Sequence, residues 1–230
     1  MNEIKQKFKR VQSEIRHAEF ALGREKNSVQ LLAVSKTKPA EDLIALYQLG
    51  QRHFGESYLQ EALVKQQQLA AFDITWHFIG PIQSNKTKSI ASHFNWVHSV
   101  DRLKIAKRLS EQRPDNLPPL NICIQVNISN ETSKSGATLE QLPLLVEEIS
   151  RLPKLCLRGV MAIPNPELDY EKQRQPYRKL HQAIQKIGLI SMDNYSFGMS
   201  SDLKAAIAEG STIVRIGTAL FGARKTQEKS

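Results

Sequence analysis

The sequence predicts a single (β/α)8 barrel of the TIM type, in the α/β class, with an extra N-terminal helix. About eight short apolar segments alternate with helix-like segments, and the 230 residues approach the roughly 250 that such a barrel needs. No Gly-rich turn follows the first strand, as it would in an open dinucleotide-binding sheet. Since no linker or shift in composition interrupts the pattern, we expect residues 1–230 to form one domain.

The elements follow from the spacing of apolar residues. Ile4, Phe8, Val11 and Ile15 form one apolar stripe, which predicts a helix over residues 2–22. The predicted strands are 31–34, 53–55, 76–79, 96–98, 122–126, 157–161, 195–197 and 213–216. The predicted helices between them lie near 43–47, 58–70, 86–92, 102–111, 139–151, 170–187 and 203–209.

Composition excludes several classes of protein. The two cysteines and six histidines show no zinc-type spacing, so we expect reduced, buried thiols and no metal site. No segment approaches the roughly 18 apolar residues of a membrane span, and the N-terminus lacks the apolar run of a secretory signal. We therefore expect a cytoplasmic protein that does not contact a membrane.

The net charge of +9 raises the alternative of nucleic-acid binding. The basic residues cluster at positions 5–10, 102–108 and 224–225. The first two clusters lie on predicted helices whose other face is apolar, and few aromatic residues interleave them. This pattern favours solvated helix faces, so we expect no nucleic-acid partner, although a basic field also attracts small anions.

Lys36 is the first candidate for chemistry. The active site of a barrel lies at the C-terminal ends of the strands, and Lys36 directly follows the first predicted strand. A partly desolvated amine there, near the like charge of Lys38, favours the neutral, nucleophilic form. From position alone, a solvated loop lysine is an equal alternative.

Two loops predict a phosphate site. The seventh predicted strand leads into residues 198–202 (GMSSD) and the eighth into Gly217 and Thr218. Barrels often bind phosphate with the loops after these two strands, using hydroxyls and the N–H groups at the start of a short helix. Helix capping by Ser200, Ser201 or Asp202 is the alternative.

Arg215 completes the candidate set. It lies within the apolar segment 213–217, where an unpaired charge is costly, so it needs a partner inside the barrel mouth. From position alone, a structural ion pair explains this arginine as well as a ligand does.

Five motifs follow one another along almost the whole chain. They are LAVSKTKP (32–39), WHFIGPIQSNK (76–86), GVMAI (159–163), FGMSSD (197–202) and VRIGTALFG (214–222). In this order they resemble the pyridoxal phosphate homeostasis protein family, which shares its fold with the N-terminal domain of alanine racemase. One departure is Ser57, which stands where the family usually has Asn, so that a direct contact from this residue to a cofactor becomes a bridged one.

The resemblance implies a cofactor and the residues that hold it. Pyridoxal 5′-phosphate (PLP) would form a Schiff base with Lys36. The other cofactor-binding candidates are Ser57, Met161 beside the ring, Ser200, Ser201, Gly217 and Thr218 at the phosphate, and Arg215 at the pyridine nitrogen. A guanidinium can only donate, so the ring nitrogen would stay unprotonated and the cofactor would be a weakened electron sink.

The resemblance also implies a function without strong catalysis. We expect a monomeric carrier or buffer in PLP (vitamin B6) homeostasis, whose partners are PLP and PLP-dependent apo-enzymes, and no catalytic residue. Alanine racemase takes a tyrosine acid/base from a separate second domain, and we expect no such domain in this protein. A PLP-dependent amino-acid racemase or lyase is the alternative, with Tyr58 and Tyr195 as the phenols to consider. A second PLP site on a loop lysine such as Lys134 stays open.

Overall fold

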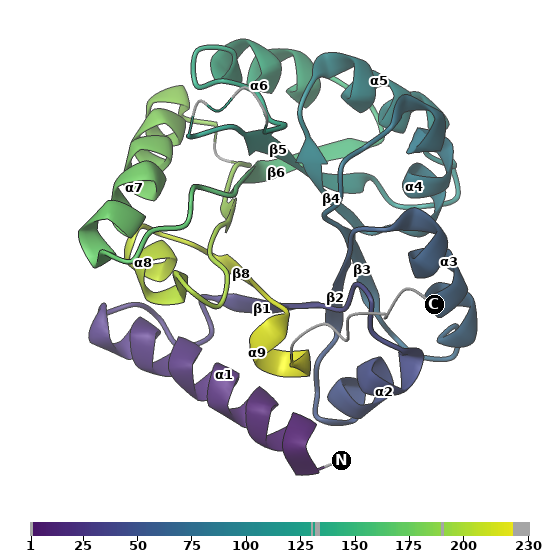
Figure 1. Ribbon diagram of the computed structural model, residues 1–230. Coiled ribbons are helices and arrows are strands. Elements are labelled where there is room, and N and C mark those ends of the chain that lie inside the picture. Colours follow the sequence, from purple (N-terminus) through teal and green to yellow (C-terminus); the bar gives the residue numbers. More distant parts are fainter. Residues whose placement is uncertain (1, 130, 132–133, 190, 223–230) are drawn as a thin grey trace, which may run out of the picture.

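A computed structural model describes residues 2–129, 131, 134–189 and 191–222. Eight parallel strands in chain order close into a barrel, in which β1 pairs with both β2 and β8 (Figure 1). The strands are β1 (Gln30–Val34), β2 (His53–Glu56), β3 (Thr75–Phe78), β4 (Trp96–Val100), β5 (Leu120–Val126), β6 (Leu155–Ala162), β7 (Asn194–Ser196) and β8 (Ile213–Ile216).

Helices surround the barrel. They are α1 (Asn2–Ala21), α2 (Ala40–Gln48), α3 (Leu59–Gln68), the 3-10 helix η1 (Ser84–Lys86), α4 (Thr87–His93), α5 (Leu103–Gln112), α6 (Leu142–Ser150), α7 (Tyr170–Ile187), α8 (Leu203–Ala208) and α9 (Thr218–Phe221). The N-terminal helix α1 crosses the outside of the barrel beside α2, α8 and α9 (Figure 1). Its stripe of Phe8, Val11 and Ile15 is fully buried, as its spacing predicts.

The two faces of the strands carry different side chains. Outward residues such as Phe54 and Phe78 are apolar and pack beneath the helices. Several inward positions are small or polar instead, among them Gly55, His77 and Arg215. A Cβ on Gly55 would lie 3.3 Å from side-chain atoms of Ile79 and Leu32, a tight contact that would require these side chains to shift by a few tenths of an ångström. The barrel thus buries a polar interior within an apolar shell.

The predicted barrel, its eight strands and its N-terminal helix are confirmed. Two details differ. The helix α9 has only four residues, too few to show a periodic signal, and was not predicted. Cys123 is buried, whereas Cys156 is half-buried, because it lies near the start of β6, where the barrel is open to solvent.

The basic clusters at 5–10 and 102–108 lie on helix faces and are partly neutralised. Lys7 pairs with Glu3, Arg10 with Glu14, and Arg102 with Asp101. The cluster at 224–225 lies outside the described residues. In the described part of the chain, no helix combines the length and the apolar character needed to cross a membrane.

Candidate functional site

A cavity of about 430 Å³ opens at the C-terminal ends of the strands. Seven of the eight predicted site residues lie on its wall: Lys36, Ser57, Ser200, Ser201, Arg215, Gly217 and Thr218. Met161 does not. It is buried in β6 opposite Gln125 and Ser196, and Ile163, two residues further along, lines the cavity instead. The structure therefore brings an amine, three hydroxyl-bearing residues near β7 and β8, and a guanidinium into one site.

The loop that carries Lys36 is held from behind by a buried ion-pair cluster. The Ser35 hydroxyl donates to Glu56 Oε1 at 2.6 Å, and Lys65 Nζ donates to the Ser35 carbonyl at 2.8 Å. Lys65 also pairs with Glu56 at 2.8 Å and with Glu61 at 2.5 Å. Because neighbouring residues of an extended chain point to opposite sides, anchoring Ser35 outward turns Lys36 inward.

The same cluster fixes the turn after Lys36. Thr37 has φ of 64°, a left-handed conformation that is costly for a β-branched residue. Its N–H donates to Glu61 Oε1 at 2.6 Å, which ties the strained turn to α3. Burial raises the pKa of Glu56 against the opposing influence of Lys65, and Glu56 Oε2 has no hydrogen-bond partner among the described residues.

The loop after β7 turns sharply at Gly198. Its φ is 85°, and a Cβ there would lie 2.6 Å from the Cβ of Ala206, so that only glycine allows α8 to approach the strand. The capping alternative expected a side-chain cap on α8, but the Asp202 side chain makes no capping hydrogen bond to this helix. Its carboxylate instead accepts from Met199 N–H at 2.6 Å and from the Tyr177 hydroxyl at 2.7 Å. This clamp leaves Ser200 and Ser201 exposed at the cavity.

The loop after β8 passes directly into α9. Gly217 precedes the helix and Thr218 is its first residue, with an exposed side chain. The N–H groups of Leu220 and Phe221 donate to the Gly217 carbonyl at 2.9 Å, so that within the described residues those of Thr218 and Ala219 remain available to a ligand. This loop faces the same cavity as Ser200 and Ser201. The two loops after strands seven and eight therefore form one polar wall.

Arg215 is 4% exposed and reaches the cavity from β8. Its Nη1 donates to the carbonyl and, at 2.9 Å, to the hydroxyl of Ser196, and its Nη2 donates to the Ala162 carbonyl at 3.0 Å. All of these acceptors are uncharged. In the described part of the chain no carboxylate forms an ion pair with Arg215, so the alternative of a structural ion pair is wrong there.

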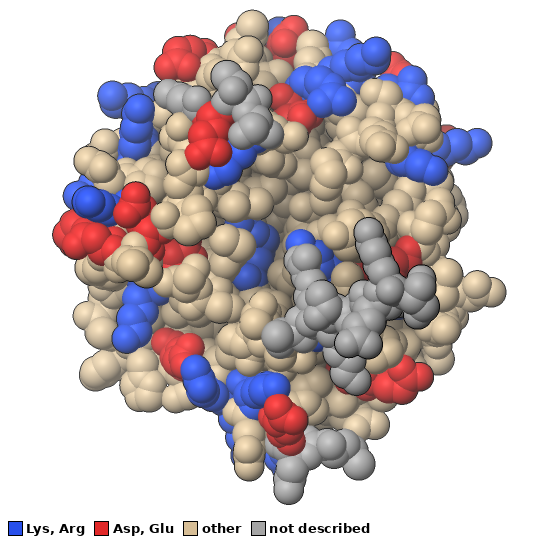
Figure 2. Space-filling model, viewed as in Figure 1, with Lys and Arg blue, Asp and Glu red and all other residues tan. Residues whose placement is uncertain are grey.

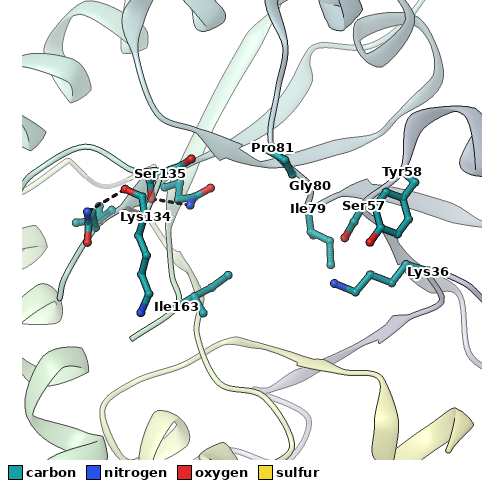
Figure 3. A pocket seen from close by; sticks show the side chains of 12 residues that line it. Lys36, Ser57, Tyr58, Ile79, Gly80, Pro81, Lys134, Ser135 and Ile163 are labelled. Atoms are coloured by element: carbon teal, nitrogen blue, oxygen red, sulfur yellow. Dashed lines mark hydrogen bonds between the residues drawn. The ribbon is translucent and has the colours of Figure 1, made fainter. Parts of the chain in front are cut away.

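A second lobe of about 490 Å³ adjoins the first. Lys36, Ser57, Ile79 and Ile163 line both lobes, so that Lys36 stands at their junction. Figure 3 shows Lys36 pointing toward the centre of this space and Lys134 lying on its opposite side, where Lys134 pairs with Glu131. Basic side chains also lie at the centre of the barrel face in Figure 2, a field that attracts an anionic ligand.

Ser57 lies between the lobes, where the loop that follows β3 passes very close to it. A Cβ on Gly80 would lie 2.1 Å from the Ser57 carbonyl oxygen, so glycine is required for this approach. Ser99 donates to the Gly80 carbonyl at 2.5 Å and so holds the contact in place. Sequence reasoning did not identify Ile79, Ile163 or the supporting Lys65. The i,i+4 spacing of Glu61 and Lys65 was the one available signal for that ion-pair cluster.

The fold and this cavity define a barrel of the alanine racemase type. Residues 10–225 match the family model described as alanine racemase, N-terminal domain, and the chain belongs to this family. An alanine racemase from Corynebacterium glutamicum has the same fold, with a TM-score of 0.65 at 16% identity over 96% of this chain and 62% of that one.

Relatives of higher sequence identity assign the chain to a more specific family. A protein of Pseudomonas aeruginosa is 57% identical over 97% of both chains, and one of Escherichia coli is 49% identical over 100% of both. Each is named pyridoxal phosphate homeostasis protein, and the chain belongs to this family. A structure of PipY from Synechococcus elongatus with PLP bound has a TM-score of 0.78 at 34% identity, covering 90% of this chain and all of that one.

Proposed function

We propose that this protein holds PLP as a Schiff base on Lys36 and acts in PLP homeostasis as a cytoplasmic carrier or buffer without strong catalysis. One observation carries the proposal: Lys36, the two hydroxyl-bearing loops and Arg215 line a single cavity. Its volume of about 430 Å³ lies in the range of small-molecule sites. PLP supplies an aldehyde that condenses with amines, and its aldehyde, phosphate and ring nitrogen each have a complementary residue on the wall of this cavity.

Each residue has one task in this proposal. Lys36 provides the amine, and its neighbour Ser35 fixes its direction through Glu56. Ser200, Ser201, Gly217 and Thr218 bind the phosphate with hydroxyl and N–H donors. Ile79 and Ile163 provide apolar contacts beside the ring, whereas Met161 supports the site from below. Ser57 lines both lobes, where we propose a contact bridged by water.

The position of Arg215 supports a carrier. A guanidinium donates hydrogen bonds and accepts none, so it leaves a facing ring nitrogen unprotonated. An unprotonated ring withdraws electrons weakly and gives little help to reactions at an amino acid's α carbon. The two candidate phenols support the same conclusion. Tyr195 packs against His181 and Phe197 outside the cavity, and Tyr58 is 50% exposed at the edge of the second lobe.

The spectrum of the purified protein with PLP tests the binding site. We expect an imine absorbance band that borohydride abolishes, with the reduced cofactor found on the peptide that contains Lys36. Lys36→Ala should lose the band and remain folded, because the side chain is at the cavity wall and not in the apolar core. Lys134→Ala is the matched control, since it removes a lysine from the adjoining lobe. A colourless wild-type protein in excess PLP would refute the proposal.

Two assays separate a carrier from an enzyme. A carrier restores activity to a PLP-dependent apo-enzyme at a rate set by the release of PLP from Lys36. We expect this result from the present protein, and we expect the protein to be a monomer. Turnover of D- or L-amino acids well above that of free PLP would instead support the racemase or lyase alternative.

A further inference from the structure

A chain of five side chains runs through the barrel interior from Arg215 to the opposite rim. Arg215 Nη1 lies 2.9 Å from Ser196 Oγ, which lies 2.8 Å from His98 Nδ1. His98 Nε2 lies 2.9 Å from His77 Nδ1, and His77 Nε2 lies 3.0 Å from His53 Nδ1. Strands β4 and β7 are three apart in the barrel, so the contact from His98 to Ser196 crosses the interior (Figure 1).

The middle of the chain is inaccessible to water. His77, His98 and Ser196 are each 0% exposed. The ring of His77 also stacks on Trp96, with centroids 5.5 Å apart and planes inclined by 13°, which fixes its orientation. Only His53, the first residue of β2, is half-buried and lies at the N-terminal rim. The described residues contain no cluster of three or more His, Cys, Asp or Glu side chains suited to a metal ion.

The hydrogen bonds that link these five side chains can run in one direction only. Arg215 has no acceptor, so Ser196 Oγ must accept from it. The proton of that hydroxyl then needs an acceptor, and His98 Nδ1 is its one remaining partner in the described part of the chain. The reverse order would leave a buried hydroxyl proton unpaired, a penalty of about 1–3 kcal/mol.

This direction determines the tautomer of each imidazole. His98 accepts at Nδ1 and therefore carries its proton on Nε2, which donates to His77. His77 likewise accepts at Nδ1 and donates from Nε2 to His53. Burial and the charge of Arg215 lower the pKa of His98 to about 3, and burial lowers the pKa of His77 well below its ordinary value. Both rings are therefore neutral, as the one-way order requires.

We infer that Ser196, His98, His77 and His53 are positioning residues that lock the guanidinium of Arg215 into the orientation required at the cofactor ring. The inference rests on the proposed function. Both protons of Nη1 and one of Nη2 are used by Ser196 and Ala162. Within the described residues the second Nη2 proton and the Nε proton have no acceptor and are left for a ligand, and the hydrogen bonds to Ser196 and Ala162 oppose rotation of the guanidinium.

The tautomers can be measured directly in the protein without PLP. In two-bond 1H–15N spectra of histidine-labelled protein at neutral pH, we expect His98 and His77 to appear as neutral rings protonated at Nε2. Rings protonated at Nδ1, or at both nitrogens, would overturn the inference whatever the protein binds.

Ser196→Ala tests the link to Arg215, and Ser211→Ala is its matched control. Ser211 is a buried serine that donates only to backbone carbonyls between β7 and β8. We expect Ser196→Ala to raise the Kd for PLP about tenfold, shift the absorbance of the bound cofactor and give mixed tautomers at His98. Ser211→Ala should keep the wild-type tautomers and a Kd within twofold.

The outcomes distinguish this inference from the proposed function. If wild-type protein binds PLP and Ser196→Ala binds it equally well with an unchanged spectrum, the positioning role is wrong and the proposed function stands. If wild-type protein binds no PLP, the proposed function fails and the positioning role loses its target with it.

Discussion

Two cations in this barrel are buried to the same extent but in opposite surroundings. Lys65 and Arg215 are each 4% exposed. Lys65 lies outside the strands, between β2 and α3, and pairs with the carboxylates of Glu56 and Glu61. Arg215 lies inside the barrel, and within the described residues it donates to Ser196 and to the Ala162 carbonyl, which are uncharged.

The difference separates a structural charge from a functional one. A buried ion pair compensates both of its charges within the protein, so the site of Lys65 is complete. A buried guanidinium that contacts neutral acceptors is compensated at a distance alone, here by the Asp202 carboxylate, and it gains stabilisation from a ligand that brings an acceptor or a negative charge into contact. Lys65 thus stabilises the loop that carries Lys36, whereas Arg215 has hydrogen-bond donors available for a ligand in the cavity.

Replacing Lys65 should have the largest effect on folding. Lys65→Met leaves the buried Glu56 carboxylate without its cation, which should lower the free energy of unfolding by about 3–5 kcal/mol. Urea titration measures this loss. The double variant Glu56→Gln with Lys65→Met removes both charges and should recover much of the stability. A single variant as stable as wild type would show that the pair does not support the loop.

Replacing Arg215 should affect binding more than folding. Hydrogen bonds to charged groups contribute about 1.5–3 kcal/mol, so Arg215→Met should raise the Kd for PLP by about 10- to 100-fold. The loss of three hydrogen bonds is offset by the removal of a buried charge that no carboxylate contacts within the described residues, so we expect a smaller loss of stability than in Lys65→Met. Fluorescence titration and urea unfolding of the same preparation make the comparison. Unchanged PLP affinity would contradict the role of Arg215.

The sequence predicted Arg215 but not its surroundings, for a physical reason. A charged residue in an apolar strand stands out, and strand alternation turns it inward. Its acceptors are a side chain on β7 and carbonyls on β6 and β7, which are 53 and 19 residues away in the chain. Every residue has a backbone carbonyl, so the sequence does not indicate which carbonyl accepts a hydrogen bond. The sequence therefore predicted that Arg215 has a partner inside the barrel, but it did not identify that partner.

The placement of Met161 shows the limit of strand boundaries. The prediction ended the sixth strand at residue 161, whereas β6 continues to Ala162. Because the strand extends one residue further, the inward-facing residue that reaches the cavity is Ile163. Met161 is the preceding inward-facing residue and lies deeper in the barrel. Lys36, Ser200 and Thr218 each lie two or more residues beyond the end of their strand, so a boundary shift of one residue leaves them at the cavity, whereas Met161 was placed at the strand end itself.

The neutral neighbours of Arg215 predict a smaller effect, on the pH dependence of stability. The pKa of His98 is lowered to about 3 from an ordinary value of 6.5 by burial and then by Arg215. A lowered pKa in the folded state means that the stabilisation is present above pH 6.5 and is lost as the pH falls from 6.5 toward 3, because only the unfolded chain takes up the proton. Between pH 6.5 and 5.5, wild-type protein should lose about 1 kcal/mol through this residue.

His98→Asn removes the titrating group and should reduce the loss of stability over that interval by about 1 kcal/mol, as measured by urea unfolding at both pH values. His93→Asn is the control, since it replaces a histidine that is exposed on α4 and lies outside the barrel interior. Equal slopes for wild type and His98→Asn would mean that His98 takes up a proton in the folded barrel. In that case the interior beside Arg215 would tolerate a second cation, and the contrast with the ion-paired Lys65 would lose its basis.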